Sequence, residues 1–224
     1  MNASTITALM PILKGSFYYV SNRNFLPFDG KPMYQYMIEK LLAVTQIEKI
    51  VINTDAEEIK EFYRTNEKIL IVDRPDEFID EYVASDLITA YTLEKVKGEH
   101  FIEIQSFNPL LTINSIGSAI DQYFQYIEEG YFDSVFSMQR HESRAYDLDK
   151  RALIEEFPFV IFENRILNVF NRTNFKKQGN KKVGKSAMMY EIKEVEHTLV
   201  DSDTNYQLAK LVFENKEKFP NVFY

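Results

Sequence analysis

Short apolar runs alternate with longer amphipathic segments through the first 140 residues. Five runs have the length of buried strands: Ile6 to Met10, Lys49 to Asp55, Lys68 to Asp73, His100 to Ser106 and Asp133 to Met138. Segments of helical length separate them. Because strands that alternate with helices pair in parallel, the pattern predicts an α/β fold with a mostly parallel, doubly wound sheet and helices on both faces.

Prolines and short polar residues indicate where these elements begin and end. Pro11 is expected to end the first strand, and Pro32 suits the first turn of the first helix, in which its missing N–H costs little. Asp55 and Asn114 are the expected caps of the second and fourth helices, because their side chains accept hydrogen bonds from free backbone N–H groups.

The alternation of strand-length and helix-length segments ends after Gln139. The polar stretch from Arg140 to Arg151 is expected to be a loop or lid, and Ala187 to Ile192 a further strand. A final helix is expected from about Thr204 to Lys218, with a buried side formed by Leu208, Leu211, Val212 and Phe213. No internal repeat or linker is visible, so 1–224 is expected to form one domain, with about 140–180 as an elaboration.

Composition excludes several classes of protein. The net charge of −8 argues against a general nucleic-acid binder, although a local basic loop suffices for a nucleotide. The absence of cysteine excludes disulfides and thiolate metal sites. No stretch approaches the ~20 apolar residues of a membrane span, and the first residues lack the basic and apolar blocks of a signal peptide, so a cytoplasmic protein is expected.

The candidate chemistry begins in the loop after the first strand. This loop contains Lys14, Gly15, Ser16, Arg23 and Asn24. Loops at the carboxyl ends of parallel strands form the crevice of α/β proteins, where free N–H groups and basic side chains bind phosphate. The alternative is a surface loop with incidental charges, since glycine and lysine are common in turns.

The order of residues here resembles the start of the acylneuraminate (CMP-sialic acid) cytidylyltransferases. Pro11, Gly15, Ser16, Asn24 and the segment Gly30-Lys31-Pro32 keep that family's order. Arg23 stands for a lysine, whereas Leu13 and Phe17 stand for basic residues. The resemblance continues in the segments VINTD, RPDEFIDEYVASD, EIQSFNPLL, FENRILNVFNRTNF, MMYEI and LVDSDTNYQLAKLV, with Leu111 in place of arginine and Arg165 in place of glycine.

The resemblance implies a Rossmann-like nucleotidyltransferase fold with a small dimerisation insertion, and a homodimer. It implies a cytidylyltransferase that activates sialic acid or a related nine-carbon sugar acid with CTP, using Mg²⁺. The implied catalytic residues are Lys14, Arg23 and Asp201. The implied nucleotide-binding residues are Gly15, Ser16, Asn24 and Asp80, and the implied substrate-binding residues are Gln105, Asn164 and Lys185.

The metal site is the sharpest of these expectations. The family uses two aspartates one residue apart, whose side chains share a face of an extended segment. Asp201 and Asp203 have this spacing, whereas alignment on the last helix pairs Leu199 with Asp201 instead. A plainer interpretation is that the two aspartates cap the last helix. The basic stretch from Phe175 to Lys185 is likewise most simply a solvated loop.

A rival hypothesis belongs to another class of protein. Leu13, Phe17, Leu111 and Leu199 occupy positions that are usually polar in the family. Loss of one charge-assisted phosphate contact typically costs about 1.5–3 kcal/mol, so several such losses would reduce nucleotidyl transfer severely. The chain would then be a non-catalytic relative that binds a nucleotide or sugar, or serves as a partner subunit.

Overall fold

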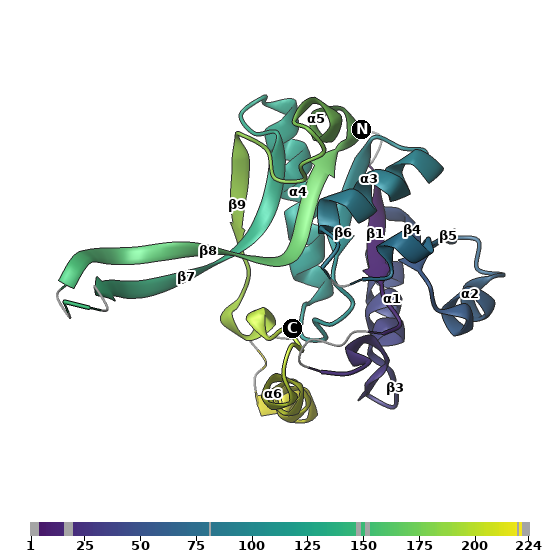
Figure 1. Ribbon diagram of the computed structural model, residues 1–224, viewed down its shortest axis with the longest axis horizontal. Coiled ribbons are helices and arrows are strands. Elements are labelled where there is room, and N and C mark those ends of the chain that lie inside the picture. Colours follow the sequence, from purple (N-terminus) through teal and green to yellow (C-terminus); the bar gives the residue numbers. More distant parts are fainter. Residues whose placement is uncertain are drawn as a thin grey trace.

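The computed structural model describes residues 5–15, 20–80, 82–146, 149–150, 153–218 and 220, with backbone only for 141–146 and 153–160. Its centre is a seven-stranded sheet in the order β5-β4-β1-β6-β8-β7-β9. Every neighbouring pair is parallel except the two that involve β8, which confirms the predicted mostly parallel sheet (Figure 1). The strands are β1 (Ile6–Ile12), β4 (Ile47–Thr54), β5 (Ile69–Asp73), β6 (His100–Ile104), β7 (Ser134–Tyr146), β8 (Leu153–Asn171) and β9 (Ala187–Glu191).

Helices cover both faces of this sheet. The α-helices are α1 (Met33–Ala43), α2 (Glu57–Tyr63), α3 (Ser85–Lys95), α4 (Ile113–Glu128), α5 (Arg172–Lys177) and α6 (Asp203–Glu214). Short 3-10 helices are η1 (Arg23–Phe25), η2 (Asp76–Phe78), η3 (Glu194–His197) and η4 (Lys216–Lys218), and β2 (Pro27–Phe28) pairs with β3 (Lys31–Pro32) in a separate hairpin.

Alternation along β1 explains the two layers. Ala8 and Met10 face one side and pack with α1 and α4, whereas Leu9 faces the other side and packs with α3 and α5. Phe175 of α5 and Leu93 of α3 belong to the second layer. Apolar residues on both faces of a strand are what a sheet covered on both sides requires.

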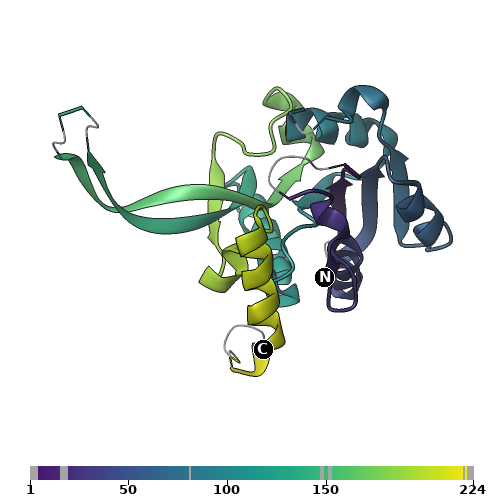
Figure 2. The same cartoon turned by 60° about the horizontal axis from the view of Figure 1, so that its bottom comes forward.

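Residues 140–146 of the expected polar loop form strand, whereas 149–150 form a turn and 147, 148 and 151 lie outside the described residues. β7 continues to Tyr146 and pairs antiparallel with β8 over most of its length. Together they leave the body as a long two-stranded ribbon (Figures 1 and 2). Polar composition gave the wrong prediction for 140–146 because the ladder of a two-stranded ribbon is formed by backbone hydrogen bonds, which polar residues make as well as apolar ones.

Several predicted boundaries also shift. β1 runs through Pro11 to Ile12, because β6 pairs only with Thr7 to Leu9 and leaves Pro11 a strand neighbour on one side alone. Thr112, not Asn114, caps α4, its side chain accepting from the Ser115 N–H at 3.1 Å.

Two further expectations about helices were wrong, one wholly and one in part. Asp55 does not cap α2, since its Oδ1 accepts from the Lys14 N–H at 2.8 Å. On α6, Leu208 and Leu211 are exposed, whereas Val212 and Phe213 are partly buried and pack against the core as expected. The buried residues of this helix are Tyr206 and Ala209. None of the helices that the structure describes combines the length and apolar character of a membrane span.

A buried polar network fixes the loop between β6 and α4. The Lys40 Nζ donates to the carbonyl oxygens of Pro109 and Leu111 at 2.6 and 2.7 Å. Fully buried Glu196 accepts from the Thr112 N–H at 2.9 Å and from Ser115 Oγ at 2.7 Å. Burial lowers the pKa of Lys40 to about 7, although the nearby Glu196 carboxylate opposes that shift.

The lowered pKa of Lys40 predicts a pH dependence of stability. Unfolding returns this pKa to 10.5, so between pH 7 and 10 the unfolded chain binds a proton that the folded chain has released. Lys40 therefore makes the free energy of unfolding rise with pH in that range. The free energy of unfolding of wild type and of Lys40→Met is measured in denaturant at both pH values. From pH 7.5 to 9.5 the free energy of unfolding of the wild type should rise by about 2 kcal/mol more than that of the variant.

The matched control for this comparison is Lys49→Met, at an exposed position on β4. A stability difference between wild type and Lys40→Met that stays constant over the same pH range would contradict the assignment.

Candidate active site

The main cavity lies where β1, β5 and β6 end. It has a volume of about 530 Å³. Its lining comes from the loops that follow β1, β5 and β6, from Asn164 and Arg165 of β8 and from the segment before α6. The ends of three neighbouring parallel strands are where the crevice of a parallel sheet is expected. The described lining residues are Pro11, Leu13, Arg23, Asn24, Arg74, Asp80, Tyr82, Val83, Ala84, Ser85, Ile88, Gln105, Phe107, Asn164, Arg165, Leu199 and Asp201.

Arg74 supplies a fixed positive charge to this cavity. Its side chain is buried at the end of β5, with Nε donating to Asn53 Oδ1 at 2.7 Å and a terminal nitrogen to the Asn53 carbonyl at 3.2 Å. Burial lowers the pKa of Arg74 to about 10, so the guanidinium is still charged at neutral pH. Because Asn53 accepts two hydrogen bonds from this guanidinium, its orientation is fixed, and its remaining N–H groups can bind phosphate or carboxylate.

Arg23 and Asn24 reach the cavity from η1. The Arg23 guanidinium lies 3.7 Å from the centre of the Phe107 ring, a cation–π contact that orients it. Asn24 donates to the Leu13 carbonyl at 2.8 Å and accepts from Ser106 Oγ at 2.6 Å. Asn24, expected to bind nucleotide, thus ties the loop after β1 to the loop after β6.

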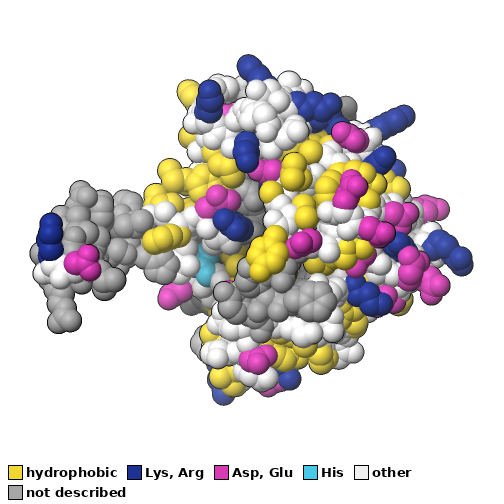
Figure 3. Space-filling model, in the orientation of Figure 1, with side chains coloured by type: hydrophobic (Ala, Val, Ile, Leu, Met, Phe, Trp, Pro, Cys, Tyr) yellow, Lys and Arg dark blue, Asp and Glu magenta, His cyan; other side chains and the backbone are white. Residues whose placement is uncertain are grey.

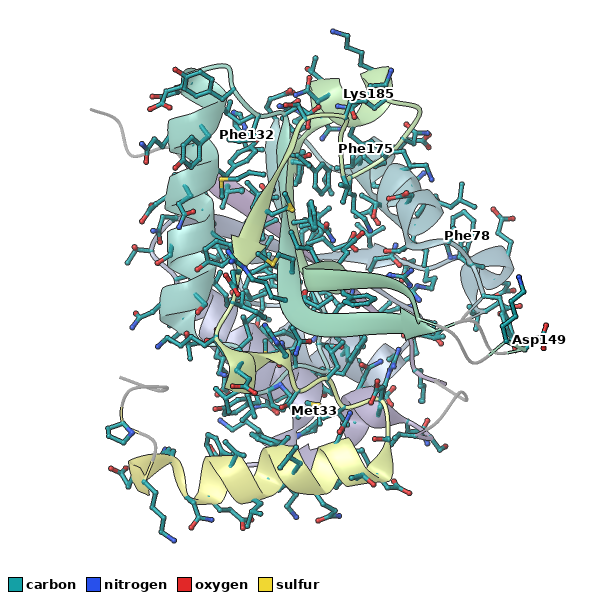
Figure 4. The ribbon with its side chains drawn as sticks, turned by 90° about the vertical axis from the view of Figure 1, so that its left-hand side faces the viewer. Met33, Phe78, Phe132, Asp149, Phe175 and Lys185 are labelled. Atoms are coloured by element: carbon teal, nitrogen blue, oxygen red, sulfur yellow. The ribbon has the colours of Figure 1, made fainter. Side chains whose placement is uncertain are left out.

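The other predicted site residues, Lys14, Gly15, Ser16 and Lys185, are not among the described residues that line the main cavity. Lys14 is exposed and pairs with Glu58 at 2.9 Å, and neither Lys14 nor Gly15 is among the described residues that line the cavity. Ser16 and Phe17 lie outside the described residues. Lys185 is exposed beside α5 at the outer edge of the molecule, likewise outside the described lining (Figure 4).

Of the two candidate metal ligands, only Asp201 lines the cavity. Its Oδ1 accepts from Asn205 Nδ2 at 2.7 Å. Asp203 is the first residue of α6, so the two aspartates do not share an extended segment. Neither caps the helix, because Ser202 Oγ accepts the Asn205 N–H at 3.1 Å.

The carboxylates present fit a magnesium ion shared with phosphates. Among the described residues there is no group of three or more acidic or histidine side chains that could enclose a metal. Mg²⁺, however, usually takes one or two carboxylates together with substrate phosphates and water. Asp201 and Asp80 are the carboxylates among the described lining residues, and they meet that requirement.

A second cavity of about 410 Å³ adjoins the first and was not predicted. Its described lining residues are Ala84, Ser85, Asp86, Glu103, Gln105, Glu163, Arg165, Asn168, Lys181, Lys182 and Val183. Gln105 and Arg165 line both cavities.

A buried ion pair forms part of the wall of this second cavity. Lys182 Nζ lies 2.6 Å from Glu103 Oε1 and also donates to Ser85 Oγ at 2.6 Å. Thr89 Oγ1 donates to the second carboxylate oxygen of Glu103 at 2.5 Å. The signal in the sequence was Glu103, an acidic residue inside an otherwise apolar strand, whose lysine partner was assigned to a solvated loop.

Asn164 and Arg165 lie at a bulge in β8. Register with β7 shifts between Phe136 and Met138, and Ser137 Oγ donates to Asn164 Oδ1 and accepts from the Leu167 N–H at 3.0 Å. The Asn164 Nδ2 has no hydrogen-bond partner among the described residues. Arg165 has φ of 57°, a left-handed conformation that costs a non-glycine residue about 1–3 kcal/mol.

Charge is distributed unevenly over the surface. Figure 3 shows basic side chains scattered over the upper part of the molecule, around α3 and α5, and acidic ones gathered on the side of α2 and β5. Although the net charge of the chain is −8, the described lining of the main cavity includes Arg23, Arg74 and Arg165.

The doubly wound sheet with its crevice is the fold of the nucleotidyltransferases. A family model described as "Cytidylyltransferase" matches residues 20–178, and the chain belongs to that family. A comparison with curated proteins finds no match.

Two solved structures support the fold. CMP:2-keto-3-deoxy-manno-octonic acid synthetase complexed with CTP is 11% identical, with a TM-score of 0.66, over 95% of this chain and 100% of that one. 4-Diphosphocytidyl-2C-methyl-D-erythritol synthase from Anaerococcus prevotii DSM 20548 is 10% identical, with a TM-score of 0.69, over 95% of this chain and 97% of that one.

The buried pair predicts a large effect of removing one charge. Glu103→Gln leaves the Lys182 ammonium without its carboxylate and should lower the free energy of unfolding by about 3–5 kcal/mol, measured in denaturant. Lys14→Ala, which breaks the exposed pair with Glu58, is the control and should cost at most about 1 kcal/mol. If the two substitutions lowered the free energy of unfolding equally, the buried pair would contribute no more to stability than an exposed one.

Proposed function

We propose that this protein transfers the cytidylyl group of CTP to a hydroxyl of a nine-carbon sugar acid, such as sialic acid or a relative, and releases pyrophosphate. The observation that carries the proposal is the main cavity, where Arg23, Arg74 and Asp201 meet from three separate segments. Membership of the cytidylyltransferase family supports CTP as the nucleotide. The resemblance to acylneuraminate cytidylyltransferases supports the sugar acid as acceptor.

In the proposed reaction the acceptor hydroxyl oxygen attacks the α-phosphorus of CTP. The bond from that phosphorus to the bridging oxygen breaks, pyrophosphate leaves with the electron pair, and the hydroxyl proton is released. Arg23 and Arg74 would balance the charge of the triphosphate, which is the main demand of phosphoryl chemistry. Gln105 and Asn164 would orient the acceptor through their amides, without adding charge.

Magnesium would be held by Asp201, with Asp80 as the second carboxylate of the cavity, and by the phosphates. When bound, it would supply further positive charge over the phosphate oxygens. Asp201 already accepts one hydrogen bond from Asn205, which fixes the direction of its carboxylate.

A homodimer is part of the proposal. The ribbon of β7 and β8 projects from the body, and Ile161, Phe162 and Met189 are exposed on β8 and β9. Exposed apolar side chains on a projecting element support a covering partner, and a second copy is the partner that the family resemblance implies. The molecular mass in solution tests this part.

The rival is a non-catalytic relative. It is favoured by Leu13 and Leu199, which line the main cavity where the related enzymes have polar groups, and by Leu111, which is fully buried. Arg74 and Arg23 oppose the rival, because they supply positive charge independently of these positions.

Thermal stability and product release separate the two. CTP with magnesium at 100 times its dissociation constant should stabilise the native protein by about 2.7 kcal/mol and raise its melting temperature. A panel of sugar acids should then release pyrophosphate, and Asp201→Asn should abolish that release. A melting temperature that rises without pyrophosphate release from any acceptor would favour the non-catalytic relative.

Arg74 gives a more local prediction. Arg74→Lys keeps the charge but loses the planar fork, so CTP affinity measured by calorimetry should fall about tenfold or more. Arg64→Lys, at an exposed position after α2, is the matched control and should leave CTP affinity unchanged. Unaltered CTP binding by Arg74→Lys would remove this arginine from the nucleotide site.

A further inference from the structure

A third cavity, of about 320 Å³, lies between α1, the start of α4 and the end of α6. Its described lining residues are Tyr36, Lys40, Thr112, Ile113, Asn114, Phe213 and Lys216. None of these residues lines the main cavity, and the proposed reaction uses none of them. Two of them are lysines, and their surroundings differ.

Lys40 has a nitrogen with two of its three positions occupied by hydrogen bonds. Nζ donates to the carbonyl oxygens of Pro109 and Leu111 at 2.6 and 2.7 Å, and no other acceptor among the described residues bonds to it. On its remaining side is the Tyr36 ring, whose centre lies 4.7 Å from Nζ. A neutral amine has two N–H groups and one lone pair. With both N–H groups on the carbonyls, the lone pair faces Tyr36, a residue of the cavity wall.

The neutral form of this amine is populated near pH 7. Burial lowers the pKa of Lys40 to about 7, although the Glu196 carboxylate of η3 favours the ammonium. The other titratable groups at the cavity are Tyr36 and Lys216. Burial raises the pKa of the Tyr36 phenol, which therefore stays neutral. A lysine that loses its proton near pH 7 is a nucleophile under conditions in which ordinary lysines are protonated.

Lys216 supplies a separate cation at the same cavity. It is the first residue of η4 and partly exposed, and its Nζ lies 4.8 Å from the centre of the Phe213 ring. No carboxylate of the described residues forms an ion pair with it. An ammonium without a carboxylate partner is available to an anion such as phosphate.

We propose that Lys40 is a modification site for small acyl phosphates, which enter the third cavity with their phosphate group on Lys216. Nζ attacks the carbonyl carbon of the acyl group. The bond from that carbon to the bridging oxygen breaks, and phosphate leaves with the electron pair. Nζ loses one proton to solvent, so the product is an amide and no further reactant is needed.

Acylation acts on the loop between β6 and α4. An amide nitrogen keeps one N–H group, so it bonds only one of the two carbonyl oxygens. The fully buried Glu196 carboxylate also loses the nearby positive charge. The same loop carries Phe107, whose ring contacts the Arg23 guanidinium in the main cavity at 3.7 Å. Acylation of Lys40 therefore weakens CTP binding, and this second half of the inference rests on the proposed function.

The test treats the native full chain with acetyl phosphate from pH 6.5 to 10 and measures acetylation of each lysine by peptide mass spectrometry. At pH 7.5 Lys40 should react at least tenfold faster than exposed Lys49, because an ordinary lysine is almost fully protonated there. Above about pH 8 the rate at Lys40 should level off, whereas the rate at Lys49 should keep rising. Equal rates, pH profiles of the same shape, or reaction of Lys40 only in denaturant would overturn the site.

A second reagent isolates the role of Lys216. Lys216→Gln should slow the reaction of Lys40 with acetyl phosphate at least threefold and leave its reaction with uncharged acetic anhydride within twofold. Lys210→Gln, on α6 and outside the described lining of the third cavity, is the matched control and should change neither rate. Equal slowing with both reagents, or slowing with neither, would remove Lys216 from the phosphate.

CTP affinity measured by calorimetry tests the effect of the modification. Acetylated wild type should bind CTP at least threefold more weakly than untreated protein. Lys40→Arg keeps the charge and resists acetylation, so its affinity should survive the same treatment. Acetylation of Lys40 with unchanged CTP affinity would refute the effect on the loop, and an equal loss in Lys40→Arg would assign it to another lysine. If untreated protein binds no CTP, the proposed function fails, whereas the acetylation rates still test the site.

Discussion

The parallel direction of β1, β4, β5 and β6 is the constraint on which the candidate site depends. Parallel strands end at the same edge of a sheet, so the loops after β1, β5 and β6 meet there without any further arrangement. Helices on both faces then exclude water from the strands, while the edge stays open. Arg74 follows β5 directly and turns back to Asn53 of β4, so one pair of neighbouring strands positions the most buried cation of the cavity.

Two interior polar networks keep the loops of this edge in place, and they work in different ways. Lys40 and Glu196 bind backbone groups of the segment from Pro109 to Thr112, which fixes the loop that begins with Gln105. Lys182 instead joins the loop after α5 to Glu103 of β6. Gly184 lets that loop approach closely, because a Cβ there would lie 2.1 Å from Asp133 Oδ1. The wall of the second cavity is therefore anchored by long-range polar contacts.

Local pattern was enough to predict the strands, most helices and the mostly parallel sheet, because apolar periodicity reflects burial on each face. It was not enough for the ribbon of β7 and β8, which is defined by antiparallel backbone pairing and not by apolar periodicity. The resemblance named Arg23, Gln105, Asn164 and Asp201 as site residues, and these four line the main cavity. Lys182 could not be found that way, since its role depends on a contact with Glu103 in a distant segment.

The central claim is that the crevice above β1 binds the triphosphate of CTP through Arg23 and Arg74. A crystal structure of the protein with CTP and magnesium tests it most directly. The account predicts phosphate oxygens within hydrogen-bond distance of both guanidinium groups, with Asp201 beside the cation. A nucleotide bound elsewhere, or a main cavity that stays without nucleotide at saturating CTP, would contradict the account.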